Sequence, residues 1–161
     1  MPSDLSIWIK SMITYHVSNA KDCFEEIQQL LHAHYEEISL LKEYALKPQY
    51  GLYEKIDENE KLKVILCKED NAIIGYIVFF ISYHLHYSDC LMAIEDIYYL
   101  KKEYRKGRVG LRMFKYAEEY LKSIGIDMVK YSTKVHVDKS SLFEYLGYTN
   151  TEKVYTKMLK D

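Results

Sequence analysis

The chain has 161 residues and a mass of 19.2 kDa, which suits a single domain (residues 1–161) with one hydrophobic core. Apolar residues make up 48% of it and charged residues 29%, with six glycines and two prolines, so collagen-like, low-complexity and wholly disordered chains are excluded. The net charge of −2 provides no overall field that would attract nucleic acid or an anionic membrane.

No segment indicates a membrane-spanning or secreted protein. The longest nearly uncharged run, residues 71–88, is too short and too polar at its end to cross a bilayer. Residues 1–10 lack the basic start and apolar stretch of a secretory signal. The three cysteines stand far apart, with no CxxC pair and no histidine at ligand spacing. We therefore expect reduced thiols, a cytoplasmic protein and no metal site.

The first part of the chain predicts one strand followed by two helices. Residues 7–17 mix β-branched, aromatic and polar side chains, as a strand does. Asn19 can cap a helix in which Cys23, Phe24, Ile27, Leu30 and Leu31 recur at helical spacing. A second helix is predicted over residues 34–45, and residues 49–60 are predicted to form a loop.

Three strands follow, and the first two form a hairpin. Residues 62–67 and 72–82 are predicted strands, joined by a turn at 68–71. The second of them, AIIGYIVFFIS, has almost no polar alternation, which is typical of a central strand covered on both faces. The third is predicted over residues 90–100 and leads into a basic loop at 101–108.

The last part of the chain predicts a helix, a strand, a short helix and a final strand. Residues 109–124 carry one apolar stripe, and Gly125 is placed to end the helix. A strand at 128–133, a helix at about 139–146 and a strand at 148–159 complete the order β-α-α-β-β-β-α-β-α-β. This order is typical of a mixed α/β domain.

The strand, loop and helix start from Ile94 to Gly110 form a candidate anion site. Backbone N–H groups at a helix start, beside glycines that allow close approach, bind anions such as a pyrophosphate. Cations are concentrated around this helix start: Lys101, Lys102, Arg105, Lys106, Arg108 and Arg112. A solvated basic loop is the other interpretation, and the residues alone leave both open.

This segment resembles a known family. YRKGRVG is similar to the acyl-CoA loop of the GNAT N-acetyltransferases, usually Arg/Gln-x-x-Gly-x-Gly/Ala between a strand and a helix. Arg105 matches the first position and Gly110 the last, while Arg108 stands where the middle glycine is usual. The hairpin ILCKEDNAIIGYIVF and the segment LFEYLGY also resemble the family, so the likeness covers about residues 61–159. The ending looks like GNAT proteins of phage or prophage type.

The resemblance implies a GNAT-like, splayed central sheet with acetyl-CoA lodged in the split. It implies that backbone groups of Tyr98, Tyr99 and Leu100 hold the pantetheine arm. The loop that would bind the pyrophosphate consists of Arg105, Lys106, Gly107, Arg108, Val109 and Gly110. In the family the amine attacks the thioester directly, which agrees with the lack of a Cys–His pair here.

An ammonium cannot attack, so the resemblance also requires a base that removes a proton. Glu95 and Asp96 are the candidates, and the family's spacing to Leu100 favours Asp96. Strand alternation puts Asp96, Tyr98 and Leu100 on one face, whereas a bulge would swap the faces and select Glu95. Phe143 occupies the position where the family often has a tyrosine that protonates the leaving thiolate. The usual general acid is therefore missing at Phe143.

No sequence motif identifies the residues that bind the acceptor. Tyr50 and Tyr53 lie in the predicted loop, and His84 and His86 share one face beside a predicted turn. These four residues are candidates for acceptor binding, although the histidines are better explained as ordinary hairpin residues. As a metal pair they lack a third ligand.

The leading hypothesis is an acetyl-CoA-dependent N-acetyltransferase that acts on a primary amine. The acceptor is either a small molecule or a protein or peptide amine, because a family resemblance identifies a site and not its acceptor. The alternative, suggested by Phe143 and Arg108, is a GNAT-fold module that binds CoA or a protein partner without turnover. Net acidity argues against nucleic-acid binding, and a homodimer is possible.

Overall fold

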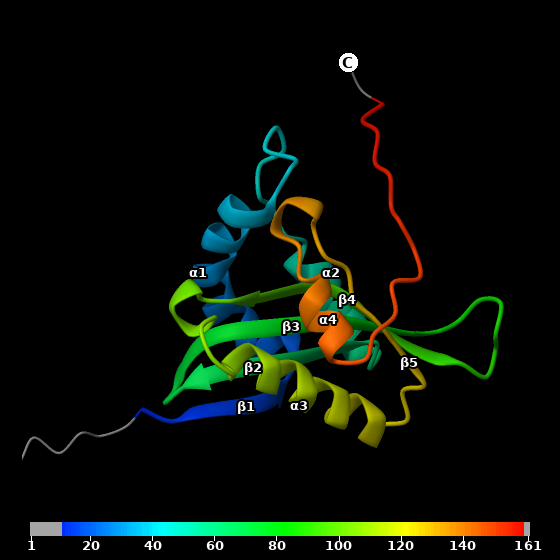
Figure 1. The fold of residues 1–161 in the computed structure, drawn as a ribbon, viewed down its shortest axis with the longest axis horizontal. Helices are drawn as coiled ribbons and strands as arrows, with labels where there is room; N and C mark the ends of the chain where they lie inside the picture. The colour runs from blue at the N-terminus through cyan, green and yellow to red at the C-terminus, as the bar shows by residue number, and fades with distance from the viewer. Residues whose placement is uncertain (1–10, 160–161) are drawn as a thin grey trace, which may run out of the picture.

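The computed structural model describes residues 11–159. Its five strands form one open sheet, flanked by four α-helices and two short 3₁₀ turns (Figure 1). In chain order the elements are β1 (Ile13–Ser18), α1 (Ala20–Ile38), α2 (Tyr50–Glu58), β2 (Leu62–Glu69), β3 (Ala72–Tyr83), β4 (Leu91–Leu100), η1 (Lys102–Tyr104), α3 (Val109–Ser123), β5 (Met128–Lys130), η2 (Val135–Val137) and α4 (Ser140–Tyr145).

The sheet is splayed at its β4–β5 end. Strands β1 to β4 are antiparallel neighbours in sequence order, while β5 runs parallel to β4 and pairs with it only over Met92–Ile94. Among the described residues, no strand pairs with the β5-facing edge of β4 beyond Ile94. The mixed α/β class and the splayed sheet are therefore confirmed.

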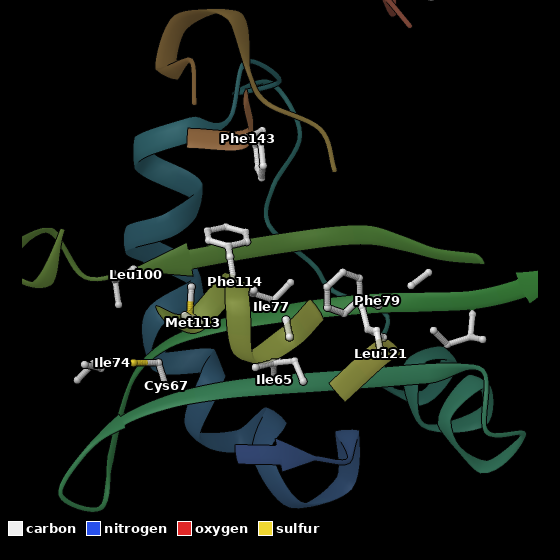
Figure 2. Close-up of a cluster of buried hydrophobic side chains, with 13 residues drawn as sticks. Ile65, Cys67, Ile74, Ile77, Phe79, Leu100, Met113, Phe114, Leu121 and Phe143 are labelled. Carbon is white, nitrogen blue, oxygen red and sulfur yellow. The ribbon is translucent and has the colours of Figure 1, made fainter. Parts of the chain in front are cut away.

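Each face of the sheet has its own hydrophobic core. Side chains of α3 and α4, among them Phe114, Leu121 and Phe143, pack on one face (Figure 2). Helices α1 and α2 cover the other face, where Ile27 and Tyr76 are almost completely buried. Because β3 is covered on both sides, its sequence is apolar without alternation, as expected of a central strand.

The predicted helix at 34–45 and the predicted loop at 49–60 are both wrong. Helix α1 continues through Ile38, since the apolar stripe that begins at Cys23 extends without a break to the buried His34. It ends at Ser39, whose backbone N–H donates to the carbonyl of Tyr35 at 3.0 Å. Helix α2 forms instead over Tyr50–Glu58, because its aromatic side chains find a packing surface on α1 that no local pattern shows.

The predicted strand at 148–159 is also wrong, and the strand predicted at 128–133 is shorter than expected. Residues 149–159 are exposed, contain no regular element and lead away from the sheet (Figure 1). They contact β5 through an ion pair between Lys130 and Glu152. A strand needs a neighbour for its N–H and C=O groups, and the three-residue β5 offers little to pair with.

The first strand begins later than predicted, at Ile13, and residues 7–10 of the prediction lie outside the described residues. The remaining strands and α3 lie within two residues of their predicted bounds. Within residues 11–159, no helix combines the length and the apolar character needed to cross a membrane.

Candidate functional site

A cavity of about 470 Å³ opens where the splayed half of β4 meets the start of α3. Its walls come from the end of α1, the second half of β4, the loop before α3 and the segment after β5. Residues expected to contact the cofactor or to act as the base line it: Glu95, Asp96, Tyr98, Tyr99, Leu100, Arg105, Gly107 and Gly110. The structure thus brings these segments together at one place.

A β-bulge interrupts the wall of this cavity. On β3, Val78 pairs with Ile97 and Phe79 pairs with Glu95, so Asp96 is the extra residue on β4. The bulge places Ile97 and Tyr99 with the α1 core, whereas Tyr98 and Leu100 pack with the α3 core. The prediction that Asp96 shares a face with Tyr98 and Leu100 is therefore wrong, because an extra residue reverses the alternation of a strand.

The two carboxyl groups at the bulge have different partners. Glu95 reaches across the split and accepts hydrogen bonds from the backbone N–H and the hydroxyl of Ser132, both at 2.9 Å. Asp96 turns toward α2 and accepts a hydrogen bond from the Tyr53 hydroxyl at 2.5 Å. Burial raises the pKa of both carboxyl groups above their ordinary values.

The start of α3 is suited to an anion. Its N-cap residue, Arg108, makes no side-chain capping hydrogen bond, and the first N–H groups of a helix have no partner within it. Gly107 has a φ of +101°, a conformation that favours glycine and lets the loop turn into the helix. Lys106 and Arg108 are exposed beside this turn. The residues present therefore fit a pyrophosphate, with cations and free amides together.

The guanidinium of Arg105 is hydrogen-bonded within the protein. Both terminal nitrogens of its guanidinium donate to the Glu37 carboxylate, one of them at 2.8 Å, and Nε donates to the carbonyl of Leu100 at 2.8 Å. These bonds join the end of α1, the end of β4 and the loop. The hydrogen bond from Arg105 lowers the pKa of the Glu37 carboxyl. This ion pair, which the sequence did not indicate, forms part of the cavity wall.

A buried histidine is another part of the site that sequence reasoning missed. His34 on α1 is 3% exposed and lines the cavity, and its ring stacks on Tyr99 with centroids 4.9 Å apart. Its Nδ1 lies 2.8 Å from the Tyr76 hydroxyl, while its Nε2 has no hydrogen-bond partner among the described residues. Burial lowers the pKa of His34 to about 4, so the ring is neutral at pH 7.

Phe143, expected near the reacting thioester, does not line the cavity. It is 7% exposed and stacks on Tyr131, with the ring centroids 5.0 Å apart. Phe114 and Tyr148 pack against it edge to face. Phe143 therefore belongs to the core beneath α4, and its neighbour Leu142 lines the cavity instead. Lys106, Arg108 and Val109 also lie outside the lining.

The tyrosines and histidines expected on the acceptor side fall in two places. Tyr50 and Tyr53 are on α2 and line a second cavity, of about 350 Å³, beside the first. His84 and His86 lie at the end of the β3–β4 hairpin, with their rings 5.7 Å apart, and line neither cavity. The structure therefore joins Tyr53 to Asp96, places Tyr50 in the wall of the second cavity and leaves the two histidines apart.

The part of the chain that the structure describes offers no cluster of metal ligands, and two of its three cysteines, Cys23 and Cys67, are buried. No group of three or more His, Cys, Asp or Glu side chains there could hold a metal ion. Burial raises the pKa of the Cys23 thiol to about 11 and that of Cys67 to about 12, so both are protonated at pH 7. Neither is therefore an activated nucleophile.

Comparison with known proteins identifies the family. Residues 24–148 match the model of the acetyltransferase (GNAT) family. The fold is similar to an aminoglycoside acetyltransferase from an uncultured soil metagenomic sample in complex with sisomicin (TM-score 0.72, 13% identity, 92% of this chain and 97% of that one). No curated protein sequence matches significantly.

Two further solved structures share the fold. The ribosomal-protein-alanine N-acetyltransferase of Brucella melitensis biovar Abortus 2308 has a TM-score of 0.69 and 12% identity, over 92% of this chain and all of that one. A predicted acetyltransferase with acetyl-CoA from Clostridium acetobutylicum has a TM-score of 0.65 and 13% identity, over 92% and 97%. The family model covers most of the chain, and the chain belongs to the GNAT acetyltransferase family.

Proposed function

We propose that this protein is an acetyl-CoA-dependent N-acetyltransferase that moves an acetyl group to a primary amine. One observation carries the proposal: the open half of β4 and the uncapped start of α3 border the same cavity as the carboxyl groups of Glu95 and Asp96. An anion-binding helix start and a base on the wall of one cavity are what this transfer requires.

Residues of the loop and of β4 would hold acetyl-CoA. The N–H groups at the start of α3 and the cations Lys106 and Arg108 would bind its pyrophosphate. The edge of β4 that faces the split would hydrogen-bond the pantetheine arm. Arg105 would position the loop through Glu37 and Leu100. When bound, the cofactor supplies an acetyl group activated as a thioester.

Asp96 is the proposed base. It faces the side of β4 that leads to the second cavity, and Tyr53 holds one of its oxygens. A raised pKa makes its carboxylate a better proton acceptor for an ammonium group, directly or through a water. Glu95 is the alternative: the bulge is the arrangement for which strand alternation selects Glu95, and both bonds from Ser132 fall on only one of its oxygens. The bulge leaves both carboxyl groups on the cavity wall.

Thermal unfolding with acetyl-CoA tests the binding half of the proposal. Ligand at about 100 times its dissociation constant should stabilise the fold by roughly 2.7 kcal/mol. Gly110→Trp should abolish the shift, because Gly110 lines the cavity at the start of α3. Gly51→Trp is the matched control, since Gly51 is exposed on α2 and lines neither cavity. A wild-type protein without a shift in millimolar acetyl-CoA would contradict the proposal.

A GNAT-fold module that binds CoA without turnover is the second candidate. The burial of Phe143 favours it, since the position that often supplies the general acid is a phenyl ring inside the core. The assay that separates the two functions incubates the protein with acetyl-CoA and a panel of amines, and reads free thiol and product mass. A thermal shift without thiol release would support the module.

A further inference from the structure

The second cavity has an unusual lining for a site that would take an amine. It lies between α1, α2 and the segment 39–48 that joins them. Apart from Ser39 and Lys47, every described residue that lines it is apolar or a tyrosine. Its volume of about 350 Å³ is within the range of small-molecule sites.

Aromatic rings form part of its wall. Phe24 meets the rings of Tyr50 and Tyr53 edge to face, with centroids 5.9 and 5.2 Å apart. Tyr53 also stacks on Phe80, at 5.9 Å between centroids. Rings held in this way form flat, fixed surfaces, which suit another ring or a compact apolar group.

The cavity adjoins the proposed active site. Five residues line both cavities: Leu31, Tyr35, Ser39, Leu46 and Ile97. Tyr53 spans them, because its ring lines the second cavity while its hydroxyl donates to Asp96 in the wall of the first. A molecule whose body fills the second cavity can therefore present its amine at Asp96.

The charges along this path admit one ammonium group. None of the described residues that line the second cavity is an aspartate or glutamate, and Lys47 would repel a cation. In the first cavity, the Glu37 carboxylate is neutralised by Arg105, while Glu95 and Asp96 are neighbours at the one bulge. A second or third ammonium group on the part of the acceptor that fills the second cavity would therefore be desolvated without a carboxylate partner.

Resting on the proposed function, we infer that the acceptor is a monoamine with an aromatic or compact apolar body, and not a polyamine. The apolar body would occupy the second cavity between Phe24, Tyr50 and Tyr53, and the amine would lie at Asp96. Burial of apolar surface would supply the binding energy.

The first experiment compares four acceptors with the full chain and acetyl-CoA: 2-phenylethylamine, cyclohexylmethylamine, spermidine and sisomicin. Free thiol and product mass give kcat/KM for each. We expect kcat/KM for the two apolar monoamines to exceed that for the two polyamines at least 100-fold. Preferential acetylation of spermidine or sisomicin would overturn the inference and leave the proposed transferase intact.

A pair of adjacent leucines provides the matched variants. Both are exposed, Leu41 at 42% and Leu40 at 63%, but Leu41 lines the second cavity and Leu40 lines neither. Leu41→Asp puts a carboxylate into the apolar wall, so the preference for 2-phenylethylamine over spermidine should fall at least 10-fold. Leu40→Asp adds the same charge outside the cavity and should leave the ratio unchanged. Equal effects of the two variants, or none, would count against the site.

A direct binding measurement separates this inference from the proposed function. Calorimetry of 2-phenylethylamine and spermidine with the wild-type protein, with CoA present, reports acceptor binding without any turnover. Binding of the monoamine alone, without thiol release from acetyl-CoA, would refute the transferase and support only an apolar monoamine as the ligand of the second cavity. Tighter binding of spermidine, or no binding of either amine, would refute the acceptor class.

Discussion

The two faces of the central sheet differ in the side-chain contacts that pack against them. On the α3 face, Tyr98, Phe114, Tyr131 and Phe143 pack ring against ring in a cluster that makes little use of polar groups. On the α1 face, ring contacts such as Phe24 with Tyr53 are accompanied by buried polar pairs: His34 with Tyr76, and Tyr53 with Asp96. Both faces stabilise the fold by packing, and the α1 face adds buried hydrogen bonds between titratable groups.

Strand β4 connects these two faces. Its bulge at Asp96 sends Ile97 and Tyr99 to the α1 side and keeps Tyr98 and Leu100 on the α3 side. A regular strand would have placed Asp96 with Tyr98. The comparison teaches that a single extra residue lets one strand serve the proposed cofactor on its open edge and the proposed acceptor on the α1 side.

The largest expected effect tests which side of the bulge carries the base. Asp96→Asn keeps the size and polarity of the side chain but removes the proton acceptor, so turnover should fall about 100-fold or more. Acetyl-CoA affinity, measured by thermal shift, should hardly change. Glu95→Gln is the paired variant and should have the smaller effect. The reverse ranking would assign the base to the side chain that Ser132 holds.

The pH dependence of kcat/KM also tests whether Asp96 is the base. A base acts when deprotonated, so kcat/KM should rise with pH through a pKa above the ordinary value of an aspartyl group, because burial raises the pKa of Asp96. Tyr53→Phe removes the hydrogen bond that stabilises the carboxylate, and should move this limb of the profile to still higher pH. A limb that Tyr53→Phe leaves in place would exclude Asp96 as the titrating group.

The next effect concerns stability on the α1 face. The pKa of His34 falls from 6.5 in the unfolded chain to about 4 in the folded one. Between these values the unfolded chain binds a proton that the folded chain does not, so the free energy of unfolding is highest above pH 6.5 and decreases as pH falls toward 4. The loss should reach about 3 kcal/mol, from about 1.36 kcal/mol per pKa unit. Denaturant unfolding at pH 7.5 and pH 4 measures it. The double variant His34→Phe, Tyr76→Phe should lose this part of the pH dependence, and an unchanged dependence would rule out His34 as its source.

A smaller effect is expected at the ion pair between α1 and the loop. A double-mutant cycle with Glu37→Gln and Arg105→Gln should show a coupling energy of about 0.5–3 kcal/mol in unfolding experiments. Each single variant should weaken acetyl-CoA binding about as much as the double variant, because each releases the same loop. Losses of affinity that simply add would indicate that Arg105 binds phosphate independently of Glu37.

The smallest effect on activity is expected on the α3 face. Phe143→Tyr adds a hydroxyl to a ring enclosed by Tyr131, Phe114 and Tyr148, so it should lower stability by about 1–3 kcal/mol and leave turnover unchanged. Melting temperature and thiol release measure the two quantities. A several-fold gain in turnover would show instead that position 143 reaches the reacting sulfur and that a general acid is missing.

Local patterns were sufficient for much of the fold and for the cofactor side of the site. Short stretches of consecutive residues are enough to predict three features: the apolar stripe of α3, the hairpin of β2 and β3, and the basic loop before Gly110. The neighbouring acids Glu95 and Asp96 are also evident in the sequence, which favoured Asp96 on a strand alternation that the bulge reverses. Their pairing with Ser132 and Tyr53 joins residues 37 and 43 positions apart.

By itself, the sequence predicted the mixed α/β class and a basic, glycine-bearing start of α3, because each depends on residues close together in the chain, while the splayed sheet was implied by the resemblance to the GNAT family. Tertiary structure alone decided that α2 forms, that residues 149–159 do not pair as a strand, and that Asp96 bulges toward α2. It also decided that His34 and Glu37 join the site. These outcomes depend on which surfaces meet after folding, and packing then overrides local propensity.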